Sequence, residues 1–179
     1  ARALGRRVSG RAQKVALTVD ADEAFLAAVV QTLQPDVLQL HGAESIGHVQ
    51  AVRRMFGLPV MKALPIAGKS DLDRVVPYAS AADLVLFDAR APREATRPGG
   101  LGNTFDWRLL QAVDPAVPYL LSGGLDAGNV GEALRITRAS GVDVSSGVER
   151  APGEKDPDKI RAFVRAARAA AADRVHSAA

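Results

Sequence analysis

Two short runs of serine and glycine carry the strongest chemical signal in this chain. Each run follows an apolar segment, and each combines bare backbone N–H groups with serine hydroxyls. Such groups bind a phosphate dianion well when they converge, because the dianion accepts many hydrogen bonds at once. The sequence therefore predicts a site for a phosphorylated small molecule between the two runs. Its predicted ligands are Ser122, Gly123, Gly124, Ser145, Ser146 and Gly147.

The residues between the two runs predict that the turns lie side by side. Asp126 is suited to cap a helix, and Val130, Ala133, Leu134 and Ile136–Thr137 then fall on one helical face. A strand–helix–strand unit makes its two strands parallel and adjacent, so their carboxyl ends open on one edge. In (β/α)8 barrels, phosphate usually binds in the loops after the last two strands.

Four polar side chains stand at or near predicted strand ends, and each allows two interpretations. Asp88 is placed either as a general acid or as a cap of the following loop. His41 either faces a substrate or bonds to a neighbouring loop. Asp143, a charge inside an apolar strand, must be bonded, either as a structural anchor or as an acceptor for a ligand hydroxyl. Lys62 either serves the substrate's negative charge at the barrel mouth or forms an ion pair with a neighbouring strand-end acid.

Strands and helices alternate along the chain without a linker, and the strands are near-continuous apolar runs, which indicates a buried parallel sheet. We predict strands over 13–19, 37–40, 59–63, 84–87, 118–121 and 142–144. We predict helices over 1–9, 22–33, 45–56, 70–78, 107–112 and 156–172, with caps at Ser70, Asp106 and Asp156 and a frayed tail after the last helix. The fold class is α/β, a (β/α)8 TIM barrel with about six of its eight strands in this chain. Residues 1–179 are expected to be one N-terminally incomplete barrel domain. The alternative is an open doubly wound sheet, but the glycine-rich loop typical of nucleotide binders is missing after the first strand.

Composition excludes several classes of function. The chain has 179 residues and no cysteine, so it can form neither disulfides nor thiolate metal sites. Its net charge is +3, but Arg is spread along the chain beside acidic residues and aromatics make up 4%, which disfavours nucleic-acid binding. Three scattered histidines disfavour a metal site. No apolar run approaches the ~20 residues of a membrane span, and a cytoplasmic location is expected.

Five motifs occur in the same order as in one known family: LQLHG at 38–42, LFDA at 86–89, GGLGNTFDW at 99–107, LSGGL at 121–125, and VDVSSGVE at 142–149 followed by PGEKD at 152–156. With them the chain resembles phosphoribosylanthranilate isomerase of tryptophan biosynthesis, a (β/α)8-barrel enzyme. The resemblance implies an Amadori rearrangement of N-(5-phosphoribosyl)anthranilate to 1-(2-carboxyphenylamino)-1-deoxyribulose 5-phosphate, without a cofactor. It also implies that Asp88 is the general acid, that His41 lies near the substrate, and that Asp143 accepts a sugar hydroxyl.

Two elements of the family pattern are missing. The family's general base is a Cys in a Lys-Ile-Cys-Gly motif on the first strand, and an Arg in a Pro-x-Ser-x-Arg loop receives the anthranilate carboxylate. Neither motif occurs in this chain. Both belong to the family's N-terminal end, so we expect that roughly 40 residues are absent there. The chain alone is then expected to be inactive and marginally stable.

Two other functions compete with the isomerase. One is another barrel enzyme with the same phosphate site, acting on indole-type phosphates. That class needs a strand-end Lys and Glu pair, and Lys62 has no evident Glu partner in the sequence. The other is a catalytically inactive barrel remnant that still binds a phosphorylated ligand.

Overall fold

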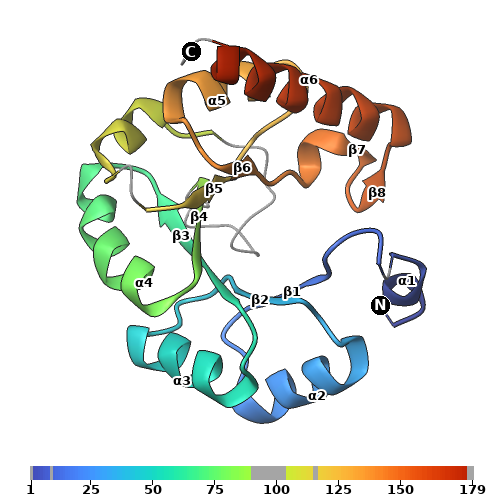
Figure 1. Ribbon diagram of the computed structural model, residues 1–179, viewed down its shortest axis with the longest axis vertical. Coiled ribbons are helices and arrows are strands. Elements are labelled where there is room, and N and C mark those ends of the chain that lie inside the picture. The colour runs from blue at the N-terminus through green and yellow to red at the C-terminus, as the bar shows by residue number, and fades with distance from the viewer. Residues whose placement is uncertain (1, 9, 90–103, 115–116, 177–179) are drawn as a thin grey trace. The chain divides into compact units, whose positions relative to one another are not determined.

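The computed structural model describes residues 2–8, 10–89, 104–114 and 117–176. The chain forms two compact units, the first from residues 1–64 and 74–86 and the second from residues 65–73 and 87–179. Strands alternate with helices in both units (Figure 1). The pairs β1–β2, β2–β3 and β5–β6 are parallel, which confirms the predicted α/β class.

The first unit is a parallel sheet with helices between its strands. Its strands are β1 (Val15–Thr18) and β2 (Val37–Leu40), with the beginnings of β3 (Val60–Ile66) and β4 (Leu84–Ala89). Its helices are α1 (Arg2–Val8), α2 (Glu23–Leu33), α3 (Ile46–Phe56) and α4 (Val75–Ala81). Register places Thr18 opposite Leu40, and Leu40 opposite Lys62, so these three side chains share one face of the sheet.

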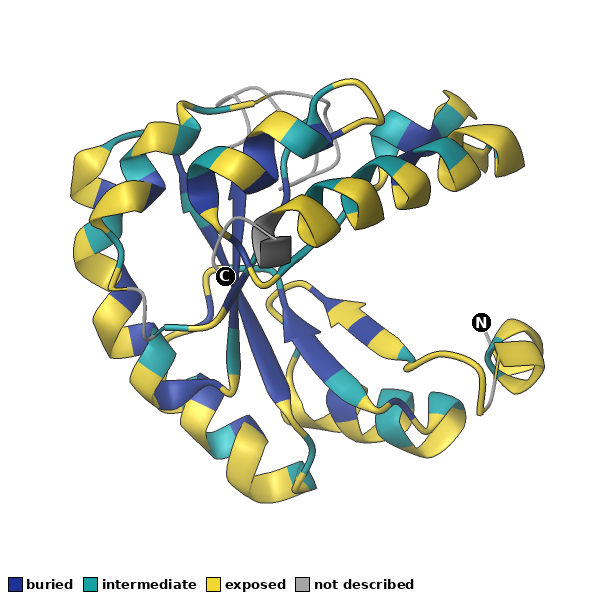
Figure 2. Cartoon of the chain, turned by 45° about the horizontal axis from the view of Figure 1, so that its top comes forward, coloured by how far each residue is buried: buried dark blue, intermediate teal, exposed yellow. Residues whose placement is uncertain are grey.

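Local sequence signals explain where α2 and α3 begin and end. The Asp22 carboxylate accepts a hydrogen bond from the N–H of Phe25, 2.8 Å away, and the Ser45 hydroxyl accepts one from the N–H of His48. Gly57 ends α3 in the left-handed conformation at φ 59°, which glycine adopts without strain. Figure 2 shows that the strands are largely buried, while the helices expose their outer faces.

The second unit holds the ends of β3 and β4 and the remaining elements. These are η1 (Lys69–Arg74, apart from its last residue), η2 (Trp107–Ala112), β5 (Tyr119–Leu121), α5 (Val130–Thr137), β6 (Gly141–Val142), η3 (Ser146–Val148), β7 (Glu149–Ala151), β8 (Glu154–Lys155) and α6 (Pro157–His176). The N–H of Ser122 donates to the carbonyl of Phe87 over 2.7 Å, which joins the end of β4 to β5. Helices α5 and α6 lie side by side (Figure 1).

The helix predicted over 70–78 begins later than expected, and the predicted cap at Ser70 is wrong. A 3₁₀ helix, η1, covers Lys69–Arg74, and the α-helix begins at Val75. Pro77 explains the boundary, because a residue without an N–H fits the first turn of a helix and breaks its interior. The later start of α4 places Pro77 in that first turn.

Asp126 does not cap α5 directly. Its carboxylate accepts hydrogen bonds from the N–H groups of Gly128 and Asn129, at 2.7 and 3.0 Å, and so closes a turn before the helix begins at Val130. Asp156, by contrast, caps α6 as predicted, through the N–H groups of Asp158 and Lys159. Helix α6 continues to His176, so the predicted fraying after Ala172 is wrong over those residues.

The sequence interpretation also missed a small hairpin. Strands β7 and β8 pair antiparallel across a turn in which Gly153 has φ 80°. This hairpin holds the PGEKD motif, and it follows directly on the second serine–glycine turn. The strand before that turn, β6, is also shorter than predicted and covers Gly141–Val142.

Candidate active site

The two serine–glycine turns lie on neighbouring strands, as predicted. Leu121 pairs with Val142 in the parallel β5–β6 ladder, so Ser122–Gly124 and Ser145–Gly147 follow the same edge of the sheet. The second turn packs against the backbone that directly follows the first, because a Cβ on Gly147 would lie 1.9 Å from the carbonyl oxygen of Leu125. A side chain at Gly147 therefore has no room.

Asp88 lies beside the first turn. It is the second-last residue of β4 and is 5% exposed. The N–H of Ala89 donates to its Oδ1 over 2.9 Å. Gly123 packs against the same stretch, since a Cβ there would lie 2.5 Å from the nitrogen of Ala89. The second unit therefore brings together a buried carboxyl group and a turn suited to phosphate.

Asp143 joins the two predicted turns through a side chain. Its Oδ2 accepts a hydrogen bond from the hydroxyl of Ser122 over 2.9 Å, and its N–H donates to the carbonyl of Leu121. Ser122 thus uses both of its donors inside the protein, its N–H on Phe87 and its hydroxyl on Asp143. The contact gives Asp143 a structural partner, and its contact with a sugar hydroxyl stays a prediction.

His41 belongs to the first unit, where it follows β2. Its Nδ1 lies 3.0 Å from Nε2 of Gln39, and its N–H donates to the carbonyl of Thr18. The loop after His41 is tightly tied, because Gly42 has no room for a Cβ beside Asp20, whose Oδ1 would lie 2.3 Å away. These bonds hold His41 at the carboxyl end of its strand. Its contact with substrate stays a prediction.

Lys62 does not serve a substrate charge at the mouth, and that interpretation is wrong. Its side chain is fully buried on the sheet face it shares with Thr18 and Leu40, and its Nζ lies 3.0 Å from Oε2 of Glu44. The ammonium also donates to the carbonyls of Leu40, Gly42 and Ala63. The ion-pair interpretation is therefore confirmed.

Glu44, the acid in this pair, escaped the sequence interpretation because it lies in the loop after β2. Its carboxylate also accepts from the N–H groups of Gly42 and Asp20. Burial alone raises the pKa of Glu44, but the hydrogen bond and charge of Lys62, together with backbone hydrogen bonds such as that from the N–H of Asp20, hold that pKa below its usual value. Burial lowers the pKa of Lys62, and Glu44 opposes that shift. We regard the pair as ionised at neutral pH, because four acceptors surround the ammonium.

Lys155 is a second residue that the sequence interpretation missed, although it stands in the PGEKD motif. Its Nζ donates to the carbonyl and the hydroxyl of Ser145, at 2.9 and 3.0 Å. It also lies 2.7 Å from Oε1 of Glu149, which completes an ion pair. The hairpin thereby contacts the second serine–glycine turn with a charged side chain.

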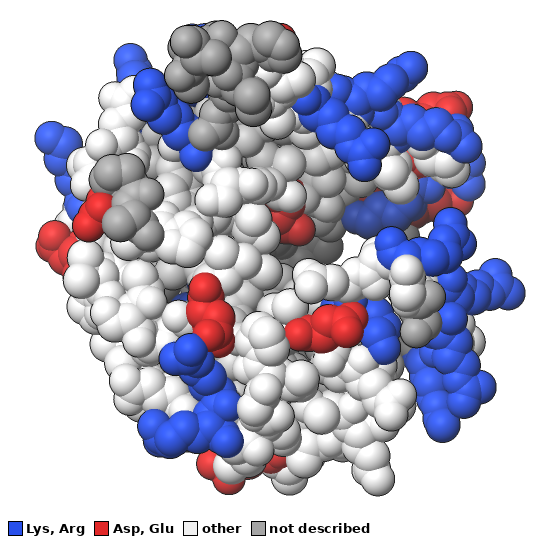
Figure 3. Space-filling model, viewed as in Figure 1, with Lys and Arg blue, Asp and Glu red and all other residues white. Residues whose placement is uncertain are grey.

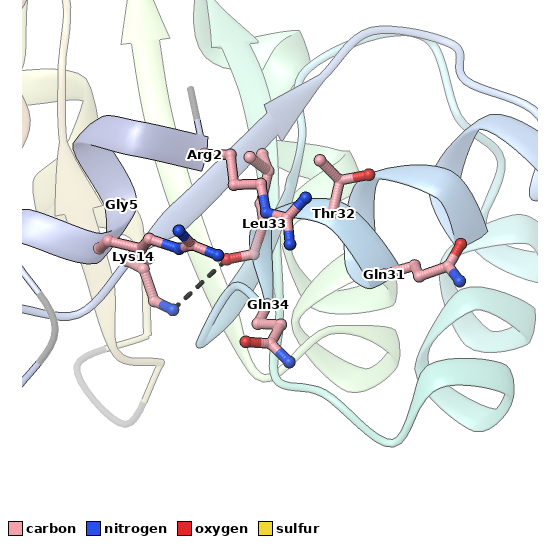
Figure 4. A pocket seen from close by; sticks show the side chains of 8 residues that line it. Arg2, Gly5, Lys14, Gln31, Thr32, Leu33 and Gln34 are labelled. Carbon is pink, nitrogen blue, oxygen red and sulfur yellow. Dashed lines mark hydrogen bonds between the residues drawn. The ribbon is translucent and has the colours of Figure 1, made fainter.

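A basic pocket of about 210 Å³ lies in the first unit, at the amino end of β1. It is lined by α1, by Lys14 and by the last turn of α2, and Lys14 donates to the carbonyl of Leu33 over 3.4 Å (Figure 4). Lys and Arg side chains gather over α1 on this side of the unit (Figure 3). None of the predicted site residues lines this pocket. Active sites of barrel enzymes lie at the other end of the sheet, at the carboxyl ends of the strands.

Among the residues that the structure describes, no group of three or more His, Asp or Glu side chains is placed to hold a metal ion. In the same residues, no helix is long and apolar enough to cross a membrane. The glycine-rich part of the motif at 99–107, residues 99–102, lies outside the described residues.

Residues 3–166 match the family model described as N-(5'phosphoribosyl)anthranilate (PRA) isomerase. The chain belongs to this family. An N-(5'-phosphoribosyl)anthranilate isomerase of Rhodopseudomonas palustris strain TIE-1 is 62% identical over 168 residues, which cover 94% of this chain and 79% of that protein. Its counterpart in Bradyrhizobium sp. strain ORS 278 is 61% identical over 170 residues, covering 95% and 78%.

Solved structures of family members are also similar to this chain. The phosphoribosyl anthranilate isomerase of Thermotoga maritima is similar with a TM-score of 0.80 and 32% identity, over 94% of this chain and 81% of that one. A structure of the isomerase in complex with reduced 1-(o-carboxyphenylamino)-1-deoxyribulose 5-phosphate matches with a TM-score of 0.77 and 29% identity, over 94% and 80%. The barrel fold predicted for this chain is therefore that of the family. About a fifth of the length of these relatives lies outside the part that this chain matches.

Proposed function

We propose that this chain, joined to the segment of its relatives that lies outside the match, catalyses the family's isomerisation of N-(5-phosphoribosyl)anthranilate in tryptophan biosynthesis, with Asp88 as the general acid. The observation that supports the role of Asp88 most directly is its position. A buried carboxyl group at a strand end lies directly against a turn suited to phosphate, Ser122–Gly124. Catalytic residues of barrel enzymes occupy such strand ends. The substrate's phosphate would thus anchor a sugar whose ring oxygen lies within reach of an acid.

The reaction moves protons and needs no net oxidation. Asp88 protonates the furanose ring oxygen, and the C1–O bond breaks as the ring opens to a Schiff base. A general base then removes the proton from C2, and the electrons shift to give the enamine that becomes the aminoketose. By family resemblance that base is a Cys, which this chain does not contain. Asp143 and His41 are proposed to contact the sugar.

The two turns are proposed to bind the phosphate mainly through their backbone N–H groups. In the described part of the second unit, the backbone N–H groups of Gly123, Gly124 and Ser146 donate no hydrogen bond to another residue. Ser145, Ser146 and Gly147 complete the predicted set, and the hydroxyl of Ser122 joins it if it leaves Asp143. Such convergent donors suit a dianion. The cytoplasmic location expected from the sequence is part of the same proposal.

The role of Asp88 is tested by the Asp88→Asn substitution. The variant is made in this chain extended by the segment of the 62%-identical R. palustris relative that lies outside the match. An amide keeps the shape of the carboxyl group but cannot deliver the proton. We expect turnover to fall about 10²–10⁴-fold. The dissociation constant for the reduced product analogue should stay within about threefold, because ground-state binding is retained.

The matched control is Asp158→Asn, which removes an exposed carboxylate that pairs with Arg161 on the surface. It should leave both turnover and binding unchanged. If Asp88→Asn keeps more than about a tenth of the parent activity, Asp88 is not the acid.

A second candidate function follows from the absence of cysteine in the chain. The chain would then bind a phosphorylated ligand without catalysing its rearrangement. Binding of the product analogue without turnover, both with and without the added segment, would favour this remnant over the isomerase.

A further inference from the structure

The ammonium of Lys155 is held in place by three oxygens. Two belong to Ser145, its carbonyl at 2.9 Å and its hydroxyl at 3.0 Å, and the third is Oε1 of Glu149 at 2.7 Å. Glu149 is itself fixed, because its other carboxylate oxygen accepts from the N–H of Gly153 and its carbonyl accepts from Lys159. The β7–β8 hairpin therefore presents one ammonium to the second serine–glycine turn in a defined direction.

This contact decides what the Ser145 hydroxyl can do. A hydroxyl has one proton to donate and two lone pairs to accept with. An ammonium has no lone pair, so Ser145 accepts from Lys155 and its own proton points elsewhere. The hydroxyl of Ser122 is in the opposite state, because it donates its proton to Asp143. Of these two serines, Ser145 is the one whose hydroxyl stays available to donate to an anion.

We propose that Lys155 is a positioning residue that orients the Ser145 hydroxyl toward the substrate's phosphate and so makes the phosphate group a condition for tight binding. The inference rests on the phosphate site proposed above. Lys155 acts through Ser145 rather than by net attraction, because Glu149 neutralises its charge at 2.7 Å. A hydroxyl already polarised by an ammonium is also a stronger donor to an anion, since hydrogen bonds in a chain reinforce one another.

The test compares two ligands on purified residues 1–179 by calorimetry: reduced 1-(o-carboxyphenylamino)-1-deoxyribulose 5-phosphate and the same compound without its phosphate. Lys155→Met should weaken binding of the phosphorylated compound about tenfold, which is the size expected for one hydrogen bond to a charged group. Binding of the dephosphorylated compound should not change. Lys155→Arg, which keeps a cationic donor, should recover much of the lost affinity.

The matched control is Arg150→Met on the same hairpin. It removes the same charge from a pair with Glu154 that is 63% and 53% exposed and does not contact Ser145. It should leave the binding of both compounds unchanged. Thermal melts of the two variants compare their folding, since a general loss of structure weakens both ligands together.

A second comparison isolates the mechanism. In a Ser145→Ala background, Lys155→Met should cost less than about threefold, because the hydroxyl it orients is gone. An undiminished tenfold loss would overturn positioning through Ser145, and so would equal weakening of both compounds. Unchanged affinity of Lys155→Met for the phosphorylated compound overturns this inference and leaves the phosphate site standing. A parent chain that binds neither compound overturns the phosphate site and the inference together.

Discussion

Replacement of Lys62 by Met should destabilise the chain more than any surface substitution. The side chains of Lys62 and Glu44 are 0% and 2% exposed, and methionine has nearly the length of lysine without its charge. The substitution leaves the Glu44 carboxylate buried without its cation, and it removes the donor shared by the carbonyls of Leu40, Gly42 and Ala63. A buried pair that loses one partner costs about 3–5 kcal/mol of unfolding free energy.

The control is Arg53→Met, which breaks the pair with Asp83 in the same unit. That pair is 49% and 32% exposed, so its loss should cost about 0–1 kcal/mol. Urea unfolding followed by circular dichroism measures both variants. A marginally stable parent leaves little unfolding free energy to lose. The parent and the two variants are therefore all compared at one fixed concentration of a stabilising osmolyte.

The pH dependence of the unfolding free energy tests the same buried pair, because the expected direction of change is known. In the parent, the pKa of Glu44 lies below its ordinary value of 4.5, so its contribution to stability is present above pH 4.5 and lost as pH falls through the folded-state pKa. Without Lys62, burial raises that pKa instead, so the folded state binds the proton more tightly and acidification stabilises the variant. The difference in unfolding free energy between parent and Lys62→Met should therefore shrink as pH falls from 7 toward 4. A loss below about 1 kcal/mol at pH 7, or a difference that widens on acidification, would refute the buried-pair argument.

The remaining predictions concern binding and the chain as a whole. Asp in place of Gly123 or Ser146 should weaken the binding of a phosphorylated ligand more than about tenfold through sterics and like-charge repulsion, and unchanged affinity in calorimetry would remove the site. Residues 1–179 alone should show no isomerase turnover and a low, broad thermal transition. In the described residues β1 pairs with β2 alone, and Val15 and Leu17 in β1 and Val19 just after it are 47%, 55% and 44% exposed. Adding the relative's segment, in cis or as a peptide, should restore both stability and turnover, whereas a sharply melting, monomeric and active chain would contradict the expectation.

Much of the local structure was readable from the sequence, because it depends on near neighbours. Apolar patterns predicted β2 over 37–40 and a helix over 45–56, and the structure confirms both, at Val37–Leu40 and Ile46–Phe56. Helix boundaries failed where one residue forced another geometry, as Pro77 did for α4. The order of the strand-end motifs identified the family, and the turns after β5 and β6 lie on neighbouring strands as expected.

The roles of individual side chains were decided by tertiary structure. Lys62 looked like a residue of the barrel mouth, but it lies within β3, which is buried on both faces around it, and Glu44 meets it from a loop 18 residues earlier in the chain. The proton of Ser122 goes to Asp143, and the orientation of Ser145 is decided by Lys155 on a hairpin that no periodicity predicted. A sequence pattern shows which groups can donate or accept. Which partner each group reaches depends on strand register and loop packing, which bring together residues that are distant along the chain.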